Sequence, residues 1–177
     1  MLLCTAGVQA QIQVYSTQQP VFEVHSFEVN ERRSEMEYVQ NSLTHKLSLS
    51  AVDSVIIQDR ILVPVKKGKK YRLFDLLTKQ NDKKLLVRKT TGVRYRGGYE
   101  APFDRYEVIV LSEEDAVFRK RFTDEKSERS MQKFAGLLPV FQAHFPDCPA
   151  LWHQFDPGYD GASVIGFLKR SNRVWCK

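Results

Sequence analysis

Between Ser54 and Phe122 the chain repeats one pattern, in which segments of five to seven residues that carry β-branched, aliphatic or aromatic side chains alternate with polar or glycine-containing segments. Runs of this length and composition are typical of β-strands. Polar turns between successive strands favour an antiparallel meander, because parallel strands need a long crossover connection. The predicted strands are 54–58, 60–65, 85–90, 92–96, 105–111 and 116–122. Residues 71–77 fit a strand or a short helix equally well.

Proline and glycine punctuate this region. Pro64 has no N–H to donate, so the strand that contains it is expected at a sheet edge or where regular pairing ends. The segment 66–70, Lys-Lys-Gly-Lys-Lys, predicts a turn around Gly68. Gly97-Gly98 and Ala101-Pro102 together predict a connecting loop.

The N-terminal region is less regular. Residues 11–20 suit an extended lead-in, and the imperfect alternation over 21–29 favours a half-buried strand. Residues 30–41 are polar and ambiguous: they fit a helix capped by Asn30, or a loop that leads into a strand near 36–39.

The apolar period changes to that of an amphipathic helix after residue 125. Apolar side chains recur at spacings of three or four, at Met131, Phe134, Leu138, Phe141 and Phe145. Pro139 predicts a break near Gly136 and a second helix that holds the proline in its first turn.

Two further helices are expected near the C-terminus. One spans about 150–155 and is capped by Asp147 or Cys148. The other runs from an Asp160 cap to Arg170, and its apolar face consists of Val164, Ile165 and Leu168.

These elements define the expected fold class. It is α+β, an antiparallel β-sheet (a meander or roll) over residues 20–122, followed by two or three short C-terminal helices within 126–173. A chain of 177 residues fits one domain, predicted to cover residues 11–177. No apolar run reaches the roughly 20 residues that a membrane-spanning helix needs.

Residues 1–10, MLLCTAGVQA, are uncharged and end in a Val-Gln-Ala sequence that suits signal-peptidase cleavage after Ala10. They lack a basic start and a full apolar segment, so the prediction is a truncated signal peptide, with a frayed apolar N-terminus as the alternative. Removal of this leader would leave two cysteines, Cys148 and Cys176. A bond between them would stabilise the fold by roughly 3–4 kcal/mol in the chain-entropy model. Two buried thiols in a cytosolic protein are the alternative.

The tail resembles a family of uncharacterised exported bacterial proteins, whose C-termini read Phe-x-Asp-Cys-Pro-x-Leu and later Tyr-Asn-x-x-Cys. Here the first motif is Phe145-Pro146-Asp147-Cys148-Pro149-Ala150-Leu151. The second departs from the family, because Ser171-Asn172 replaces Tyr-Asn and Cys176 lies one residue further on. The resemblance covers about forty residues. It implies export to the periplasm or the medium and a Cys148–Cys176 disulfide, and it brings no catalytic residues.

Basic charge is concentrated in one part of the chain. Residues 60–96 hold thirteen of the 27 Lys and Arg residues, with only two acidic residues. The candidate binding residues are Lys66, Lys67, Lys69, Lys70, Arg94 and Arg96. If their side chains share one face, they would attract an anionic glycan, a lipid headgroup or an acidic protein. The alternative is a solvated sheet face with lysines that discourage aggregation.

Other chemistries have weaker signals. No nucleic-acid-recognition motif is present, so nucleic acid is not expected as a partner. His144, Asp147, Cys148 and His153 fall close together but lack the spacing of a metal site, and no metal or cofactor is predicted. The sequence therefore predicts a non-enzymatic, exported cell-envelope protein with a basic sheet surface. The alternatives are a hydrolase with a site near His144, His153 and Asp156, and a structural protein-interaction module.

Overall fold

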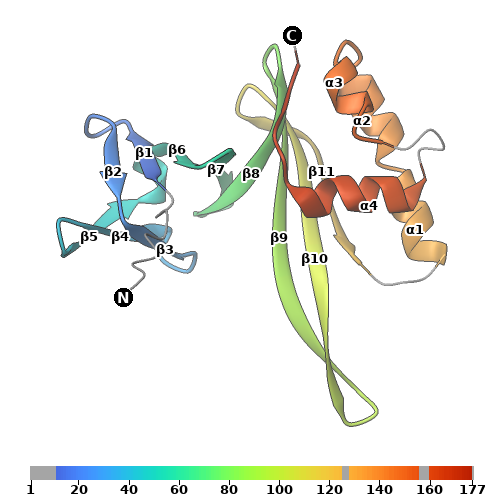
Figure 1. Ribbon diagram of the computed structural model, residues 1–177, viewed down its shortest axis with the longest axis horizontal. Helices are drawn as coiled ribbons and strands as arrows, with labels where there is room; N and C mark the ends of the chain where they lie inside the picture. Colours follow the sequence, from blue (N-terminus) through green and yellow to red (C-terminus); the bar gives the residue numbers. More distant parts are fainter. Residues whose placement is uncertain (1–10, 125–127, 156–159, 177) are drawn as a thin grey trace, which may run out of the picture. The chain divides into compact units, whose positions relative to one another are not determined.

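The structure is a computed structural model that describes residues 11–124, 128–155 and 160–176. The chain divides into two compact units: unit 1 ends at Phe74 and unit 2 begins at Asp75 (Figure 1). The sequence predicted one domain over 11–177, whereas this boundary falls inside a strand, β8 (Lys70–Gln80). The expected signal peptide, residues 1–10, lies outside the described residues.

Unit 1 contains strands of a nine-stranded sheet and a separate three-stranded antiparallel sheet. In the first, β2 pairs with β1, β1 with β6 and β6 with β7; in the second, β4 lies between β3 and β5. The chain changes sheet at His25, which splits the single strand predicted over 21–29 into two. The strands are β1 (Ile12–Ser16), β2 (Phe22–Val24), β3 (Ser26–Asn30), β4 (Glu35–Gln40), β5 (Leu43–Ser48), β6 (Val52–Ile57) and β7 (Arg60–Lys67).

The core of unit 1 forms from alternate residues of both sheets. Val14 on β1, Val55 on β6 and Met36 on β4 are fully buried in one apolar cluster. Leu49, in the short 3-10 turn η1 (Leu49–Ala51), closes the same cluster. The ambiguous segment 30–41 is thus a turn followed by a strand, because Met36 and Tyr38 alternate into this core.

Unit 2 contains an antiparallel meander of long strands. Its order is β8, β9 (Lys83–Arg96), β10 (Tyr99–Ser112) and β11 (Asp115–Thr123). Successive strands are joined by tight turns at Asn81-Asp82, Gly97-Gly98 and Glu113-Glu114. Asn81, Gly97, Gly98 and Glu113 have positive φ angles, as hairpin turns that match the twist of the strands require.

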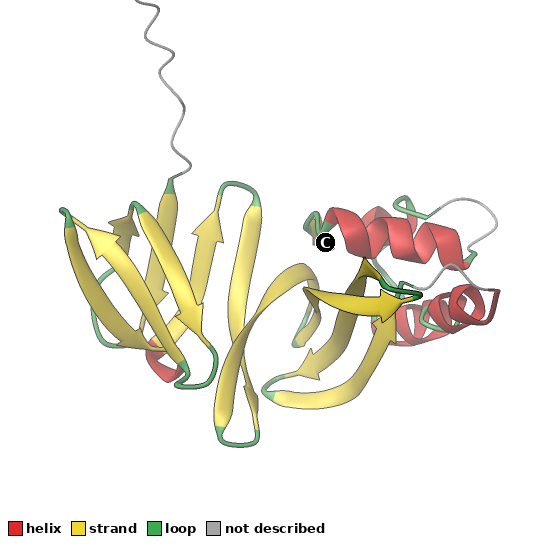
Figure 2. Cartoon of the chain, turned by 90° about the horizontal axis from the view of Figure 1, so that it is seen from below, coloured by secondary structure: helices red, strands yellow, loops and turns green. Residues whose placement is uncertain are grey.

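Helices cover one face of this sheet (Figures 1 and 2). Phe134, Phe141 and Phe167 from the helices pack with Tyr106 and Val108 of β10 in one buried cluster. The helices are α1 (Glu128–Ala135), α2 (Leu138–His144), α3 (Pro149–Trp152) and α4 (Gly161–Arg170). None of the helices in the described ranges is both long and apolar enough to cross a membrane.

A disulfide joins Cys148 to Cys176, as predicted. The two Cα atoms lie 4.8 Å apart, within the usual range for a disulfide. Cys176 follows β12 (Val174–Trp175), which pairs in parallel with β8 at Thr78 and Lys79. The Thr78 hydroxyl donates a hydrogen bond of 2.7 Å to the Val174 carbonyl oxygen. The disulfide therefore ties the start of α3 to the last strand beside β8.

The α+β fold class is confirmed, and several local predictions are refined. Residues 71–77 are strand, and Gly68 lies in a turn with φ of 61°. Pro64 is not in an edge strand, since β7 lies between β6 and β8; the pairing of β7 with β6 runs from Arg60 to Leu62 and ends before Pro64.

Two predictions were wrong in detail. Ala101 and Pro102 lie within β10 and pair with Arg94 and Val93, because the Gly97-Gly98 turn closes the hairpin by itself. The helix expected over 150–155 is the shorter α3. Cys148 occupies the N-cap position of α3 without a side-chain capping hydrogen bond. The predicted Asp160 cap of α4 is present, since Asp160 Oδ1 accepts a hydrogen bond of 2.8 Å from the Ser163 N–H.

Candidate functional site

The meander of unit 2 has two chemically different faces. Tyr106, Val108 and Val110 of β10 point to the helices, so Arg105, Glu107 and Ile109 point to the other face. The pairing register brings Arg88 of β9 opposite Glu107 on that second face. On the other side of β10, Arg121 of β11 is also opposite Glu107.

Glu107 lies at the centre of these arginines. Its side chain is only 6% exposed, and its Oε1 lies 3.5 Å from Nε of Arg121 and 4.0 Å from Nε of Arg119. The Arg121 side chain remains 64% exposed and that of Arg119 31% exposed. We call Arg88, Arg105, Arg119 and Arg121, which share this face with Glu107, the arginine face. The buried carboxylate orients the guanidinium groups of Arg119 and Arg121, which still reach solvent.

The arginine face continues onto a two-stranded ribbon, residues 91–104. Here β9 and β10 pair with each other beyond Val87, where the pairing of β9 with β8 ends, and beyond Arg105, where that of β10 with β11 ends. Phe103 crosses over Gly92, where any Cβ would approach its ring carbons to 2.8 Å. The guanidinium carbon of Arg94 lies 4.1 Å from the Phe103 ring centroid, and that of Arg105 lies 4.8 Å from it. These contacts place the two cations within about 9 Å of each other.

The predicted binding residues fall into different units. Lys66, Lys67, Lys69 and Lys70 lie at the β7–β8 turn of unit 1, and Lys66, Lys69 and Lys70 are exposed there. Arg94 and Arg96 lie on the ribbon of unit 2; Arg94 is exposed, and the Arg96 side chain lies outside the described part. The structure thus connects Arg94 with the arginine face and assigns the four lysines to the other unit.

Sequence reasoning missed Arg105, Arg119 and Arg121, which lie outside the basic segment 60–96. A usable signal was present in β11, where Arg119 and Arg121 alternate with Phe118, Lys120 and Phe122. Period-two alternation places both arginines on one face and both phenylalanines on the other. Glu107 was also not predicted as a site residue, because it is a polar residue within an otherwise apolar strand.

The helix-facing side of the meander carries a separate charge network. Asp104 lies 2.9 Å from Lys89 Nζ and accepts a hydrogen bond from the Thr91 hydroxyl at 3.1 Å. Burial opposes ionisation, but these contacts outweigh it and lower the pKa of Asp104. The Asp104 N–H donates to Asp124, which also lies 3.4 Å from Lys169 of α4. This network secures the base of the ribbon to β11 and α4.

Burial raises the pKa of the Tyr106 hydroxyl, and the negative charge of Asp104 raises it further. Tyr106 is 1% exposed, and its hydroxyl lies 3.5 Å from the Asp104 carboxylate. The group therefore stays protonated and acts as a hydrogen-bond donor within the network.

Of the three residues of the alternative enzyme site, His144 ends α2, His153 follows α3, and Asp156 lies outside the described residues. Burial lowers the pKa of His144, and the nearby charge of Lys83 lowers it further. Within the described ranges no group of three potential metal ligands occurs, and Cys148 is consumed by the disulfide.

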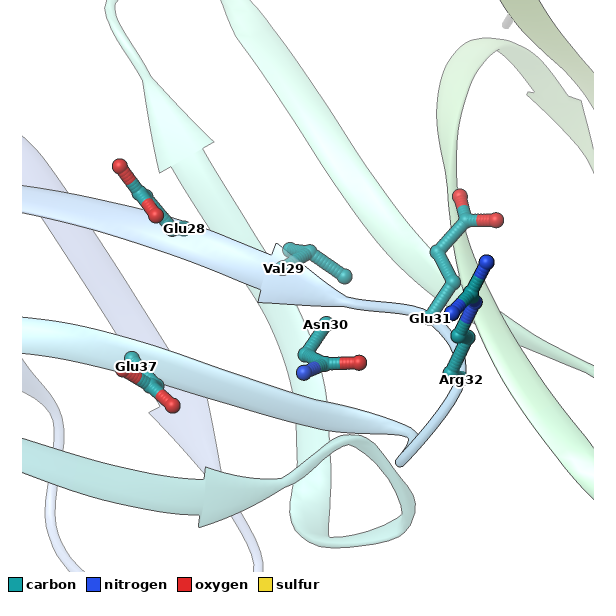
Figure 3. A pocket seen from close by; sticks show the side chains of 6 residues that line it. All are labelled: Glu28, Val29, Asn30, Glu31, Arg32 and Glu37. Carbon is teal, nitrogen blue, oxygen red and sulfur yellow. The ribbon is translucent and has the colours of Figure 1, made fainter.

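Unit 1 contains an open pocket of about 620 Å³, formed by the end of β3, the following turn and β4 (Figure 3). Glu28 and Glu37 lie directly opposite each other across β3 and β4. Glu37 pairs with Lys46 at 3.0 Å, and Glu31 with Arg72 at 3.6 Å. Because basic side chains already balance two of these carboxylates, the pocket is best explained as a solvated feature of the sheet edge.

No family model matches this sequence, and neither the curated proteins nor the solved structures contain a match. The arginine face and the disulfide are therefore the features of this chain that bear on its function.

Proposed function

We propose that this protein is an exported, non-enzymatic component of the cell envelope that binds an anionic polymer through the arginine face of unit 2. The observation that carries the proposal is the arrangement around Glu107, which orients Arg119 and Arg121 while both keep exposed surface. Cross-strand ion pairs of this kind stabilise a sheet, and here they also hold Arg119 and Arg121 on one face.

Arginine is the residue best suited to such a surface. Its planar guanidinium group binds phosphate, sulfate or carboxylate through two parallel hydrogen bonds, and it is less strongly hydrated than the lysine ammonium group. Arg94 and Arg105, ordered against Phe103, lose less side-chain entropy when they bind a ligand than unrestrained side chains would. A repeating anionic polymer can contact the ribbon and the arginine face together.

The disulfide supports the exported location. Structural disulfides persist in oxidising compartments such as the periplasm and are rare in the cytosol. Cys148, at the N-cap of α3, is fully buried, and Cys176 is partly buried. The proposed binding partner is accordingly an anionic glycan, a lipid headgroup or an acidic protein of the envelope.

Two variants with the same loss of charge test the location of the site. The first replaces Arg94, Arg105, Arg119 and Arg121 with Gln; the second replaces Lys66, Lys67, Lys69 and Lys70 with Gln. Binding to dextran sulfate is measured across a range of salt concentrations. The arginine variant should bind at least about tenfold more weakly, with a shallower salt dependence, because fewer counterions are released.

The lysine variant should keep most of the wild-type affinity. Equal losses in both variants would mean that net charge alone drives binding, and would contradict an assigned surface. Unchanged binding by both variants would remove the proposal. Circular dichroism and urea unfolding of each variant show whether the fold is retained.

A further inference from the structure

The ribbon of unit 2 carries exposed apolar surface that anion binding does not explain. Tyr99 is 81% exposed, Tyr95 78% and Val93 54%. These are three of the seven large hydrophobic side chains that are strongly exposed among the described residues, and all lie within seven positions of one another. Val93 pairs with the exposed Pro102 across the ribbon, so the two form an aliphatic pair on the face that also holds Tyr95.

Both faces of the ribbon reach solvent near its tip. The pairing of β10 with β11 begins at Arg105 and that of β9 with β8 begins at Val87, and the ribbon extends beyond both (Figure 1). Tyr95 and Tyr99 belong to opposite faces of the hairpin, next to the Gly97-Gly98 turn. A partner that docks on one face of the ribbon would contact only one of these rings, whereas a medium that surrounds the tip can contact both.

The charges near the tip favour an anionic medium. Arg94 is exposed on the same face as Tyr99, and Arg105 follows on that face toward the sheet. Glu100 is an acidic residue of the tip, and its Oε1 accepts a hydrogen bond of 2.7 Å from the Tyr95 hydroxyl. This hydrogen bond raises the pKa of Tyr95, so the phenol remains neutral. Tyrosine and arginine are well suited to the headgroup region of a bilayer, where an apolar ring and a polar end are both solvated.

We propose that the tip of the ribbon inserts Val93, Tyr95 and Tyr99 into the headgroup region of an anionic lipid bilayer. The outer edges of a two-stranded ribbon leave backbone N–H and C=O groups that need water, which limits insertion to the interface. Insertion buries apolar side-chain surface, and the arginines contribute electrostatic attraction to lipid phosphates. The inference rests on the proposed function only for the role of Arg94 and Arg105.

Sedimentation with vesicles tests the insertion. The vesicles contain phosphatidylcholine alone, or phosphatidylcholine with about one quarter phosphatidylglycerol, which supplies a surface charge. The apolar variant replaces Val93, Tyr95 and Tyr99 with Ser. Its matched control replaces Val21 and Leu43 of unit 1 with Ser, two residues that are exposed by 53% and 62%.

The wild type and the control should bind the anionic vesicles equally, and the apolar variant should bind about tenfold more weakly. The apolar variant should still bind dextran sulfate as the wild type does, because its charge is unchanged. Equal vesicle binding by the apolar variant and the wild type would overturn insertion while leaving polymer binding intact. Binding of the wild type to dextran sulfate but not to anionic vesicles would overturn it as well.

A fluorescence measurement provides independent evidence for depth. In the Tyr99→Trp variant, lipids brominated near the headgroup end of the acyl chain should quench the new tryptophan on anionic vesicles. The wild type, which contains Trp152 and Trp175, corrects for the background. Absence of added quenching in a variant that still sediments would contradict insertion and would indicate binding by surface charge alone.

Discussion

Asp160 shows how one side chain controls the start of a helix. Its carboxylate accepts hydrogen bonds from the N–H and the hydroxyl of Ser163, in the first turn of α4. The hydrogen bond from the Ser163 N–H is the largest cause that lowers the pKa of Asp160. The ionised form is therefore the one that the folded state favours.

This shift predicts a pH-dependent effect of the Asp160→Ala substitution. Because the pKa is lower in the folded state, the stability that ionised Asp160 contributes is present above its unfolded pKa and is lost as pH falls through the folded pKa. The variant should unfold at lower urea concentration than the wild type at pH 7, and the difference should shrink below about pH 4.

The Asp160→Asn variant is the matched control, since an amide oxygen caps a helix without titrating. The Asp160→Asn variant should resist urea better than Asp160→Ala by the same amount at pH 7 and at pH 3. An undiminished difference between the wild type and Asp160→Ala at pH 3 would show that the charge of Asp160 does not contribute.

At the scale of elements, the crossing of α1 and α4 depends on a glycine. Gly161 begins α4 against the backbone of Met131 in α1, and a Cβ there would overlap the Met131 carbonyl oxygen. The ribbon uses a glycine in a related way, since Gly92 makes room for the ring of Phe103. In both places the missing side chain lets another group approach the backbone, which the periodicity of apolar residues does not reveal.

Gly161→Ala should therefore lower the free energy of unfolding by roughly 2–3 kcal/mol, because the two helices must separate to accommodate a methyl group. Gly166→Ala, in the same helix, is the matched control. The nearest atom to a Cβ at Gly166 belongs to the flexible Arg170 side chain at 3.5 Å, so this change should be neutral or stabilising by up to about 1 kcal/mol. Urea unfolding measures both, and a similar effect of the two substitutions would contradict the close helix crossing.

At the scale of the whole molecule, the chain comprises two compact units with different means of stabilisation. Among the described residues, unit 1 has an apolar core between two small sheets, and unit 2 has a core between the meander and the helices that a disulfide reinforces. Tyr106 and Phe134 pack edge to face within that second core, with ring centroids 5.9 Å apart. The disulfide joins residues 28 positions apart around this core.

Replacing Cys148 and Cys176 together with Ala should lower the free energy of unfolding of unit 2 by about 3–4 kcal/mol in the chain-entropy model. Hydrogen exchange should show the loss as faster exchange in α2, α3 and β12. A reducing agent should reproduce the effect in the wild type and leave the double variant unchanged. Equal protection in the oxidised wild type and the double variant would contradict a stabilising role.

The sequence alone determined the features that depend on neighbouring residues. Strand runs such as 105–111, the Gly68 turn and the Asp160 cap were predictable because hydrophobic period and turn chemistry are local properties. The Cys148–Cys176 pair was predictable because only two cysteines remain after the proposed leader. The start of β10 was not predictable from the sequence, because the tight Gly97-Gly98 turn lets the strand include Ala101 and Pro102.

Only the tertiary structure decided which charged residues meet. Lys66 to Lys70 and Arg94 are neighbours in a charge profile, yet they belong to different units. Arg88, Arg105, Arg119 and Arg121 come from three strands, and the pairing register places them on the same face as Glu107. Electrostatic attraction depends on distance in space, and strand pairing, which a linear sequence does not display, sets that distance.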